Sequence, residues 1–504
     1  MKKKISMKKT LSMLFSVAIA CTCLSSCSLK QTAKGGKMDI SNVTIPTFAD
    51  TEGLVICAYS GPTVENWSGT SRNVSTLTDE HMQKLVDAGF TRLHAIHEGG
   101  WGAKGNSVYD YVKNTTDKAV EDAVIALELC EKYGIEYMVR DWNLYDCRNF
   151  VDDLSTPQDE GLDTREEIEK AMDIILDGQD YIYSPAFYGH LGADEPGAHQ
   201  FDLIKIWMDV YYEKLAELGV EGEFHFNLLP AYGSITSYGG VTYTEYVEQY
   251  FEKIAPTLGY VSYDYYPFLK DNTKGSLLRT SYISNLELMA NLCKKNNVEL
   301  RTFICTGADF TGLRDLTSIG DFRFQMYTTM AFGTRDITYY EYGTFKSQHE
   351  GEFGLINLQD GTYNYTYDLA KQVNNEVHAF EDAYLHYNYD GVMCFSALPE
   401  GKININFRGV NNLLESHPRI ANVEHTQDTL LTSFKDAEGN DAFMLVNYTD
   451  PFFDLDDRVT IQFNDAKGLL MYRFGQEYIV PLNADGTYTF ELYPGEGRFI
   501  IPLK

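Results

Sequence analysis

The feature that most constrains the fold is a regular alternation of short apolar runs and longer helical stretches between about residues 53 and 343. Eight of the apolar runs have the length of strands, and the stretches between them repeat their apolar residues at helical spacing. Eight strands that alternate with helices are typical of a (β/α)8 barrel, the TIM barrel. We therefore predict barrel strands at Leu54–Ser60, Arg92–His97, Glu136–Asp141, Phe187–Ala193, Glu223–Leu229, Tyr260–Tyr266, Leu300–Thr306 and Asp336–Tyr342.

Glycines at the ends of the helical stretches support this interpretation. Gly89, Gly134 and Gly219 each follow a helical pattern and precede an apolar run, which is where a helix C-cap is expected before the next strand. The helices are predicted at Thr78–Ala88, Asp117–Lys132, Thr164–Leu176, Asp202–Leu218, Thr244–Ile254, Tyr282–Lys295 and Ile319–Phe332.

After about residue 375 the helical spacing ends and short strand patterns separated by turn residues take over. This pattern is typical of an all-β sandwich, so we predict a barrel over residues 51–375 and a sandwich over 376–504. The last run is expected to be an edge strand. Sandwich strands are predicted at Gly391–Leu398, Lys402–Phe407, Thr429–Phe434, Ala442–Asn447, Arg458–Phe463, Leu469–Phe474, Glu477–Pro481, Thr487–Leu492 and Gly497–Pro502.

The N-terminus has the pattern of an exported lipoprotein. Five lysines precede the apolar run Leu11–Ala20, which is too short for a stable membrane span, and Leu24–Cys27 resembles a bacterial lipobox. Residues 1–26 are therefore predicted to be a signal peptide, Cys27 the lipid-bearing residue, and residues 27–50 a flexible tether. The mature chain is expected outside the cytoplasmic membrane, at the cell surface, in contact with the membrane only through this lipid.

The charge of the chain limits its partners. The 504 residues carry a formal net charge of −30, and removal of five lysines and no acids with residues 1–26 makes it −35. Such a chain repels nucleic acid, so a neutral glycan is the simpler partner. No phosphate-binding glycine motif and no metal-ligand spacing is present, so we expect no cofactor and no metal. The six cysteines after position 27 are widely scattered, and few or no disulfides are expected.

The segment Tyr188–Gly197 carries the strongest functional signal. An apolar run ends in two adjacent carboxylates, Asp194 and Glu195, followed by Pro-Gly. At the carboxyl end of a barrel strand these side chains would lie on the catalytic face. A carboxyl group beside apolar residues tends to keep its proton, which suits Glu195 as a general acid. The structural alternative is a helix N-cap at Asp194 with Pro196 in the first turn.

Further carboxylates follow other predicted strands. Glycoside hydrolysis requires two carboxyl groups beside the scissile bond, one as proton donor and one as nucleophile or base. We predict Glu341 as the second catalytic residue, with Asp264 next in rank. Each polar or aromatic residue at the same rim is, taken alone, more often structural than a substrate contact. Together they favour a polar site with aromatic walls. The predicted substrate-binding residues are Asp194, Asp264, His97, Glu98, Arg140, Asp141, Trp142, His225, Asn227 and Tyr266.

The barrel layout with Glu195 after strand four, followed by a sandwich, resembles the clan-A glycoside hydrolases, including β-galactosidase-like enzymes. The chain departs from that clan in two ways. The proton donor of the clan usually follows Asn, whereas Asp194 precedes Glu195, and the strand that should end in the nucleophilic Glu reads Thr302–Gly307. The resemblance implies carbohydrate hydrolysis, and the departures leave the nucleophile open.

Two alternatives remain. The stretch His190–Glu195 is similar to the His-x-Gly-Gly-Asp-Glu motif of β-hexosaminidases. That resemblance implies that the Asp steers the acetamido group of the substrate, which then acts as the nucleophile. The second alternative is a surface protein that binds glycans without cleaving them, on a barrel that has lost its catalytic residues.

Overall fold

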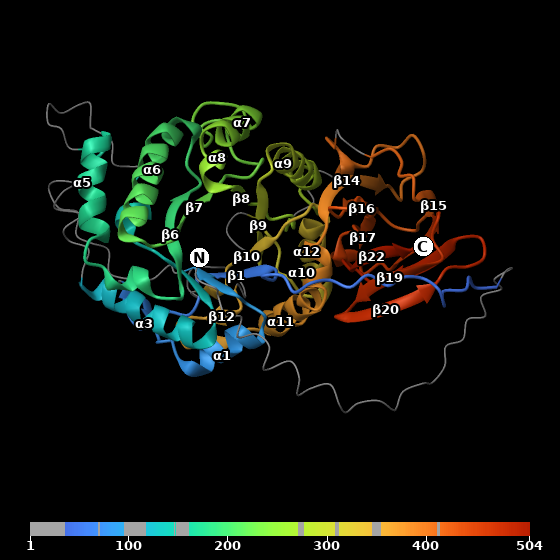
Figure 1. The fold of residues 1–504 in the computed structure, drawn as a ribbon, viewed down its shortest axis with the longest axis horizontal. Coiled ribbons are helices and arrows are strands. Elements are labelled where there is room, and N and C mark those ends of the chain that lie inside the picture. Colours follow the sequence, from blue (N-terminus) through green and yellow to red (C-terminus); the bar gives the residue numbers. More distant parts are fainter. Residues whose placement is uncertain are drawn as a thin grey trace.

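The computed structural model describes residues 36–68, 71–94, 117–145, 147, 161–270, 277–307, 312–344, 354–410 and 414–504. It confirms the predicted fold class: a TIM barrel is followed by a β-sandwich, and the two lie side by side (Figure 1).

All eight predicted barrel strands are present. They form one parallel sheet in the order β7-β6-β5-β4-β1-β10-β9-β8. The sheet closes where the Leu228 N–H donates to the carbonyl of Ser262 at 2.9 Å, beside a parallel bridge between Leu228 and Tyr263. The strands are β1 Val55–Tyr59, β4 Arg92–His94, β5 Glu136–Val139, β6 Phe187–Asp194, β7 Glu223–Asn227, β8 Tyr260–Asp264, β9 Glu299–Cys305 and β10 Asp336–Tyr340.

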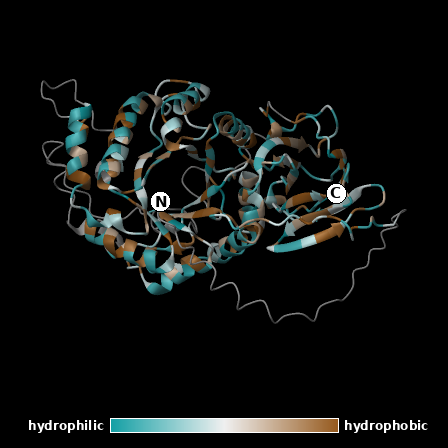
Figure 2. Ribbon diagram, in the orientation of Figure 1, coloured by the Kyte–Doolittle hydropathy of each residue, from teal (hydrophilic) through white to brown (hydrophobic). Residues whose placement is uncertain are grey.

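Helices follow these strands and cover the outside of the barrel. Thr164, Thr242 and Ser318 begin three of them with capping boxes, and Gly219 ends another in the left-handed conformation. Figure 2 shows hydrophilic and hydrophobic residues along the same helices, as expected of helices with one face on the barrel. They are α1 Asp79–Asp87, α3 Asp117–Tyr133, α4 Trp142–Tyr145, α5 Arg165–Leu176, α6 Phe201–Leu218, α7 Tyr243–Lys253, α8 Ala255–Leu258, α9 Tyr282–Asn296, α10 Ile319–Ala331, α11 Tyr365–His378 and α12 Glu381–Leu385.

Short elements complete the barrel domain. A hairpin follows β1, and a small sheet follows β10. Single 3-10 turns precede and follow β6. These elements are β2 Asn66–Ser68, β3 Ser71–Asn73, β11 Gly343–Thr344, β12 Ile356–Asn357, β13 Thr362–Tyr363, η3 Asp180–Tyr183 and η4 Ala198–Gln200. In the described part of the chain, no helix has the length and apolar character needed to cross a membrane.

The sandwich consists of a six-stranded sheet, β14-β16-β17-β22-β19-β20, and a three-stranded sheet, β15-β18-β21. The strand predicted at Lys402–Phe407 is wrong, because these residues include a 3-10 turn, η5 Ile405–Phe407. The last strand is central rather than at an edge. The strands are β14 Asn388–Phe395, β15 Ile420–Glu424, β16 Thr429–Lys435, β17 Asp441–Asn447, β18 Asp457–Phe463, β19 Gly468–Arg473, β20 Gln476–Pro481, β21 Thr487–Leu492 and β22 Gly497–Leu503.

The two domains share a packed interface. Phe324 of α10 stacks on Tyr448, and Phe380 stacks on Phe499 of β22. The predicted boundary at residue 375 lies inside α11, so the barrel domain extends to α12 and the sandwich begins at β14. The helices continue to about residue 385. The sequence pattern therefore placed the domain boundary ten residues too early.

The prediction of a flexible tether is wrong for residues 36–50. Lys37 forms a β-bridge with Asn483, and the Met38 N–H donates to the carbonyl of Leu482 at 2.8 Å. Further along, the Phe48 ring contacts His386. This segment therefore runs along the sandwich to the barrel, as the blue trace in Figure 1 shows. The predicted signal peptide and Cys27 lie outside the described residues.

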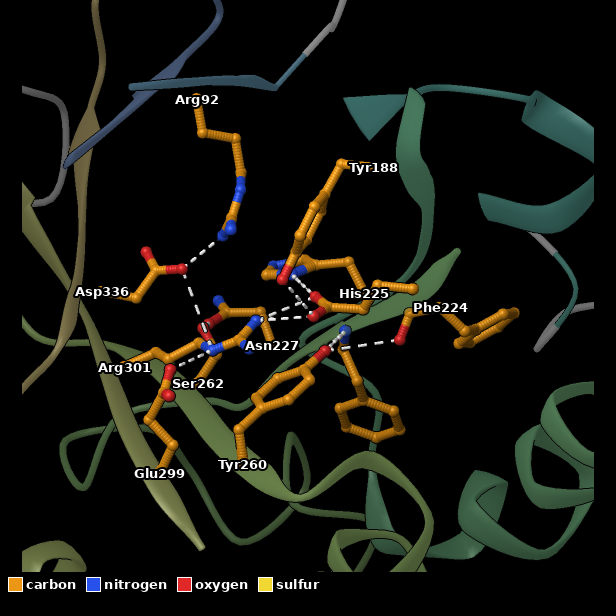
Figure 3. A network of polar contacts seen from close by, with 12 residues as sticks. Arg92, Tyr188, Phe224, His225, Asn227, Tyr260, Ser262, Glu299, Arg301 and Asp336 are labelled. Atoms are coloured by element: carbon orange, nitrogen blue, oxygen red, sulfur yellow. Dashed lines mark hydrogen bonds and ion pairs between the residues drawn. The ribbon is translucent and has the colours of Figure 1, made fainter. Parts of the chain in front are cut away.

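The amino-terminal half of the barrel interior is charged rather than apolar (Figure 3). Arg301 of β9 pairs with Glu223 of β7 at 2.8 Å, and Arg92 of β4 pairs with Asp336 of β10. Burial alone would raise the pKa of Glu223, but Arg301, His225 and Arg92 outweigh burial and hold this pKa well below its ordinary value. Because Arg92, Glu223 and Asp336 each begin a strand, the network fixes the end of the barrel opposite to the carboxyl ends of the strands.

Candidate active site

Four polar residues meet where β6, β7 and β8 end. Asp194 is the last residue of β6, Glu195 follows it, Asn227 ends β7 and Asp264 ends β8. This end of the barrel is the face at which TIM-barrel enzymes carry their active sites. The structure therefore brings together three carboxyl groups and an amide that the sequence pattern had placed at this rim.

A β-bulge decides which way Asp194 points. The register between β6 and β7 shifts between Leu191 and Ala193, so that Gly192 is the extra residue. A side chain at Gly192 would collide with the ring of Phe224, 2.2 Å from an added Cβ. Because a bulge reverses the alternation of side chains along a strand, Asp194 faces the rim residues while His190 faces Tyr181 and the helices outside.

Glu195 has an unusual backbone. Its φ of 50° lies in the left-handed region, which residues other than glycine rarely adopt. The conformation is held because the Glu195 N–H donates to the carbonyl of Asn227 at 2.9 Å. Glu195 is exposed, whereas Asp264 is buried. Backbone strain of this kind is concentrated at functional sites, and here it presents a carboxyl group to solvent at the barrel rim.

Asp264 and Glu195 interact as a carboxyl pair. Burial, and then the negative charges of Glu195 and Asp194, raise the pKa of Asp264 well above its ordinary value. The pair therefore holds one proton to a higher pH than an isolated carboxyl group does.

Asn227 connects the carboxylates. Its Nδ2 donates to Asp194 Oδ1 and to Asp264 Oδ1, both at 3.3 Å, and its Oδ1 accepts from the Ser262 hydroxyl at 2.9 Å. Ser262 fixes the orientation of the amide, since a hydroxyl that donates must face the amide oxygen. Ser262 precedes Asp264 by two residues on β8, so strand periodicity alone places both side chains on one face.

Aromatic and cationic residues surround this cluster. The Tyr145 hydroxyl donates to Asp194 Oδ2 at 3.1 Å, and the Arg140 guanidinium lies over the Tyr145 ring at 4.1 Å. Tyr266 stacks on Tyr340 with ring centroids 5.5 Å apart, and Tyr340 is 5.7 Å from Tyr59. The predicted residues Arg140 and Tyr266 thus lie at the same rim as the carboxylates.

Sequence analysis missed Tyr232, which follows β7. Burial, and then the charge of Asp264, raise the pKa of the Tyr232 phenol. Arg279 lies over the Tyr232 ring at 3.9 Å, and its Nε donates to the carbonyl of Tyr266 at 2.9 Å. Both residues come from loops without periodic sequence, so no pattern indicated them.

Glu341 is buried just after β10, and the peptide bond before it is cis. The Glu341 N–H donates to the Thr306 hydroxyl at 3.1 Å, and this hydroxyl donates to the Glu341 carbonyl at 3.0 Å. Thr306 follows β9, whose end carries the nucleophile in the clan that the chain resembles. Here that residue holds the main chain of Glu341 and Gly354.

The remaining predicted residues divide into three groups. His225 lies below the rim, where it bonds Glu223 at 3.4 Å and contacts the His94 ring at 4.7 Å, and its role as a substrate contact stays a prediction. Asp141 is half-buried, and its carbonyl accepts from the Leu144 and Tyr145 amides at the start of α4. His97, Glu98 and the side chain of Trp142 lie outside the described residues.

Within the described ranges, no group of three or more His, Cys, Asp or Glu residues is arranged to hold a metal ion. The six cysteines after position 27 are all described, and none of them forms a disulfide with another described cysteine; five are buried.

We expect Asn227→Ala to move the basic limb of the pH–activity profile upward by about one pH unit, because loss of the donor to Asp264 Oδ1 raises the pKa of this carboxyl group further. Turnover should fall about 10- to 100-fold with little change in KM. Ser262→Ala should produce a smaller shift in the same direction. Asn374→Ala is the matched control, since Asn374 is buried in α11 and donates to the Ala88 carbonyl at 2.8 Å, at the opposite end of the barrel. A basic limb that stays in place in Asn227→Ala contradicts the assignment.

No protein-family model matches the chain, and no curated protein does either. Solved structures similar to it include a glycoside hydrolase family 5 protein from Bacteroides vulgatus, 10% identical, with a TM-score of 0.49 over 89% of this chain and 88% of that chain. A GH30 endoxylanase from Clostridium papyrosolvens is 11% identical, with a TM-score of 0.44 over 90% and 97%. A GH51 arabinofuranosidase from Xanthomonas axonopodis pv. citri is 10% identical, with a TM-score of 0.43 over 88% and 93%. The structures to which this chain is similar are thus glycoside hydrolases, and its function has to be argued from its own residues.

Proposed function

We propose that this protein is a glycoside hydrolase that cleaves O-glycosidic bonds of a neutral glycan, with Glu195 as the proton donor. The observation that carries the proposal is the Glu195–Asp264 pair. Burial of Asp264 raises the pH at which the pair loses its proton. Glu195 is exposed and accessible to a ligand at the barrel rim.

In this reaction Glu195 transfers the shared proton to the glycosidic oxygen as the bond from that oxygen to the anomeric carbon breaks. Water adds to the anomeric carbon, directly or after a nucleophile has been displaced, and its proton returns to the pair. Asn227 keeps Asp194 and Asp264 in place while the charge of the cluster changes. Tyr340, the partly exposed ring of the group formed with the buried Tyr59 and Tyr266, provides an aromatic surface for a sugar ring.

Asp264 is not suited to be the nucleophile. A nucleophilic carboxyl group must be ionised when it attacks the anomeric carbon. Burial and the charge of Glu195 raise the pKa of Asp264 and so favour its protonated form, which does not attack. Glu341 remains the proposed second carboxylate, and Asp264 is assigned to holding the proton.

A β-hexosaminidase-like reaction is the second candidate. It is favoured by the engagement of Asp264 with Glu195 and by Asp194, which Tyr145 and Asn227 hold beside the proton donor. In such a reaction the acetamido group of the substrate replaces the enzyme nucleophile. Cleavage of 2-acetamido-2-deoxy glycosides, without cleavage of the matching 2-hydroxy glycosides, would favour this candidate.

The deciding experiment is a screen of the wild-type protein and Glu195→Gln against aryl glycosides and neutral polysaccharides. Release of sugar by the wild type and its loss in the variant support the proposal. Polysaccharide binding without product after prolonged incubation identifies a non-catalytic glycan-binding protein instead.

We further propose that the mature chain is attached to the outer side of the cytoplasmic membrane, or to the cell surface, by a lipid at Cys27. The basic N-terminus, the short apolar run and the lipobox-like Leu24–Cys27 support this. Cys27→Ser is expected to move the protein from the membrane fraction to the soluble fraction. Ser28→Ala, beside the lipidation site, should leave it in the membrane fraction. Retention of Cys27→Ser in washed membranes would contradict the proposal.

A further inference from the structure

We infer that Phe452 and Phe453 form a second glycan-binding site, a platform on the sandwich beside the catalytic face of the barrel. This inference rests on the proposed function. The two phenylalanines are 62% and 53% exposed, and their ring centroids are 5.6 Å apart at an angle of 86°. Exposed single apolar side chains are common, whereas two adjacent aromatic rings held toward solvent mark a binding surface.

The turn that carries the rings is held from below. Phe452 and Phe453 belong to the 3-10 turn η6 Pro451–Phe453, whose N-cap Asp450 accepts from the Phe452 N–H at 3.0 Å. Asp450 is buried and pairs with Arg314 of the barrel at 2.6 Å. Arg314 also pairs with Asp321 at 2.9 Å. Because a buried ion pair is costly to separate, the rings stay in a fixed position relative to the barrel.

The platform adjoins the loops that extend from the proposed active site. Phe268 follows Asp264 by four residues, and the Arg314 guanidinium lies over the Phe268 ring at 4.3 Å and 5.7 Å from the Phe452 ring. Leu269, after β8, forms a bridge with Leu313, after β9. These contacts place Phe452 beside the segments that leave the ends of β8 and β9, on the side of the barrel where Glu195 lies.

The size of the patch favours a sugar over a protein partner. A fully accessible aromatic side chain offers about 150–250 Å², so the two rings together expose roughly 200–250 Å². A stable protein–protein interface needs about 800 Å² from each partner. An area of this size instead matches one or two sugar rings, whose C–H faces pack on aromatic rings.

The charge around the rings favours a neutral ligand. Asp454 and Asp456 are exposed beside Phe453, and the whole chain carries a formal net charge of −30. Negative charge at this position repels an anionic membrane surface. Carboxylates also accept hydrogen bonds from sugar hydroxyl groups. The chemistry of the platform is therefore that of an uncharged polysaccharide chain.

The test uses the full-length protein in native gels that each contain one soluble neutral polysaccharide: a xylan, a galactomannan, an arabinan or a mixed-linkage β-glucan. We expect at least one polysaccharide to retard the wild type. Phe452→Ala/Phe453→Ala should weaken this binding about fivefold or more, as expected for the loss of two aromatic contacts. Tyr183→Ala is the matched control, because Tyr183 is 57% exposed near the start of β6, at the opposite end of the barrel.

Three results would overturn the inference: no retardation of the wild type in any gel, equal retardation of the double variant, or a wild-type dimer in size-exclusion chromatography that the double variant dissociates. In the Glu195→Gln background, which lacks the proposed proton donor, loss of both rings should weaken binding by the same factor, which separates the platform from catalysis. If sugar is never released but the double variant loses binding, the proposed hydrolase activity fails and the platform stands. If aryl glycosides are cleaved and binding does not depend on the rings, the platform fails alone.

Discussion

Replacement of Glu195 by Gln is expected to slow hydrolysis of glycans and alkyl glycosides by about 10²–10⁴-fold, the contribution typical of a general acid. The leaving groups of these substrates need a proton when the glycosidic bond breaks. The amide of Gln is too weak an acid to donate one. Dinitrophenolate leaves as an anion and needs no proton. Cleavage of dinitrophenyl glycosides should therefore slow less than about tenfold at the step that breaks the glycosidic bond. The measurement is kcat/KM for glycosides whose leaving groups span a wide range of pKa.

Two further variants help to interpret the effect of Glu195→Gln. Glu221→Gln is a matched control, because Glu221 is exposed before β7 at the other end of the barrel and should leave all rates unchanged. Asp264→Asn removes the second titrating member of the pair, so the basic limb of the pH–activity profile should move to lower pH. A uniform loss across all leaving groups in Glu195→Gln would show that Glu195 binds substrate rather than donating a proton.

Replacement of Arg301 by Met is expected to cost about 3–5 kcal/mol of unfolding free energy, because it leaves buried carboxylates without their cation. Arg301 pairs with Glu223, donates to Glu299 and stacks on Tyr260 at 3.7 Å inside the barrel. Chemical denaturation followed by the fluorescence of Trp207, which is fully buried in α6, measures the effect on the barrel.

The control for this prediction is Arg165→Met. Arg165 pairs with Glu169 at 2.8 Å on the surface of α5, with both side chains about half exposed, so its loss should cost less than about 1 kcal/mol. The double variant Arg301→Met/Glu223→Gln should recover part of the lost stability, because one of the unpaired charges is removed with its partner. Equal costs for the two arginines would contradict the view that the barrel interior depends on this network.

The sequence predicted the barrel well because its signal is local. Each strand from β1 to β10 of the barrel sheet is a short apolar run between helices with recognisable caps, such as Thr164 and Gly219. The sandwich was predicted less well, because short strands lack a cap signal. β15 was missed, η5 was mistaken for a strand, and β22 was expected at an edge although it pairs with β17 and β19. Strand order depends on contacts between distant segments, which no local pattern encodes.

The pattern of strands and helices is enough to place Asp194, Glu195, Asn227 and Asp264 at the carboxyl ends of their strands, and hence at one rim. How these residues interact depends on the folded barrel. The bulge at Gly192 turns Asp194 inward, the left-handed backbone of Glu195 exposes its carboxyl group, and burial beside two negative charges raises the pKa of Asp264. The folded structure also places His225 below the rim, in contact with Glu223. Charge, burial and side-chain direction depend on neighbours that are distant in the chain, whereas strand and helix patterns depend on residues that are close in it.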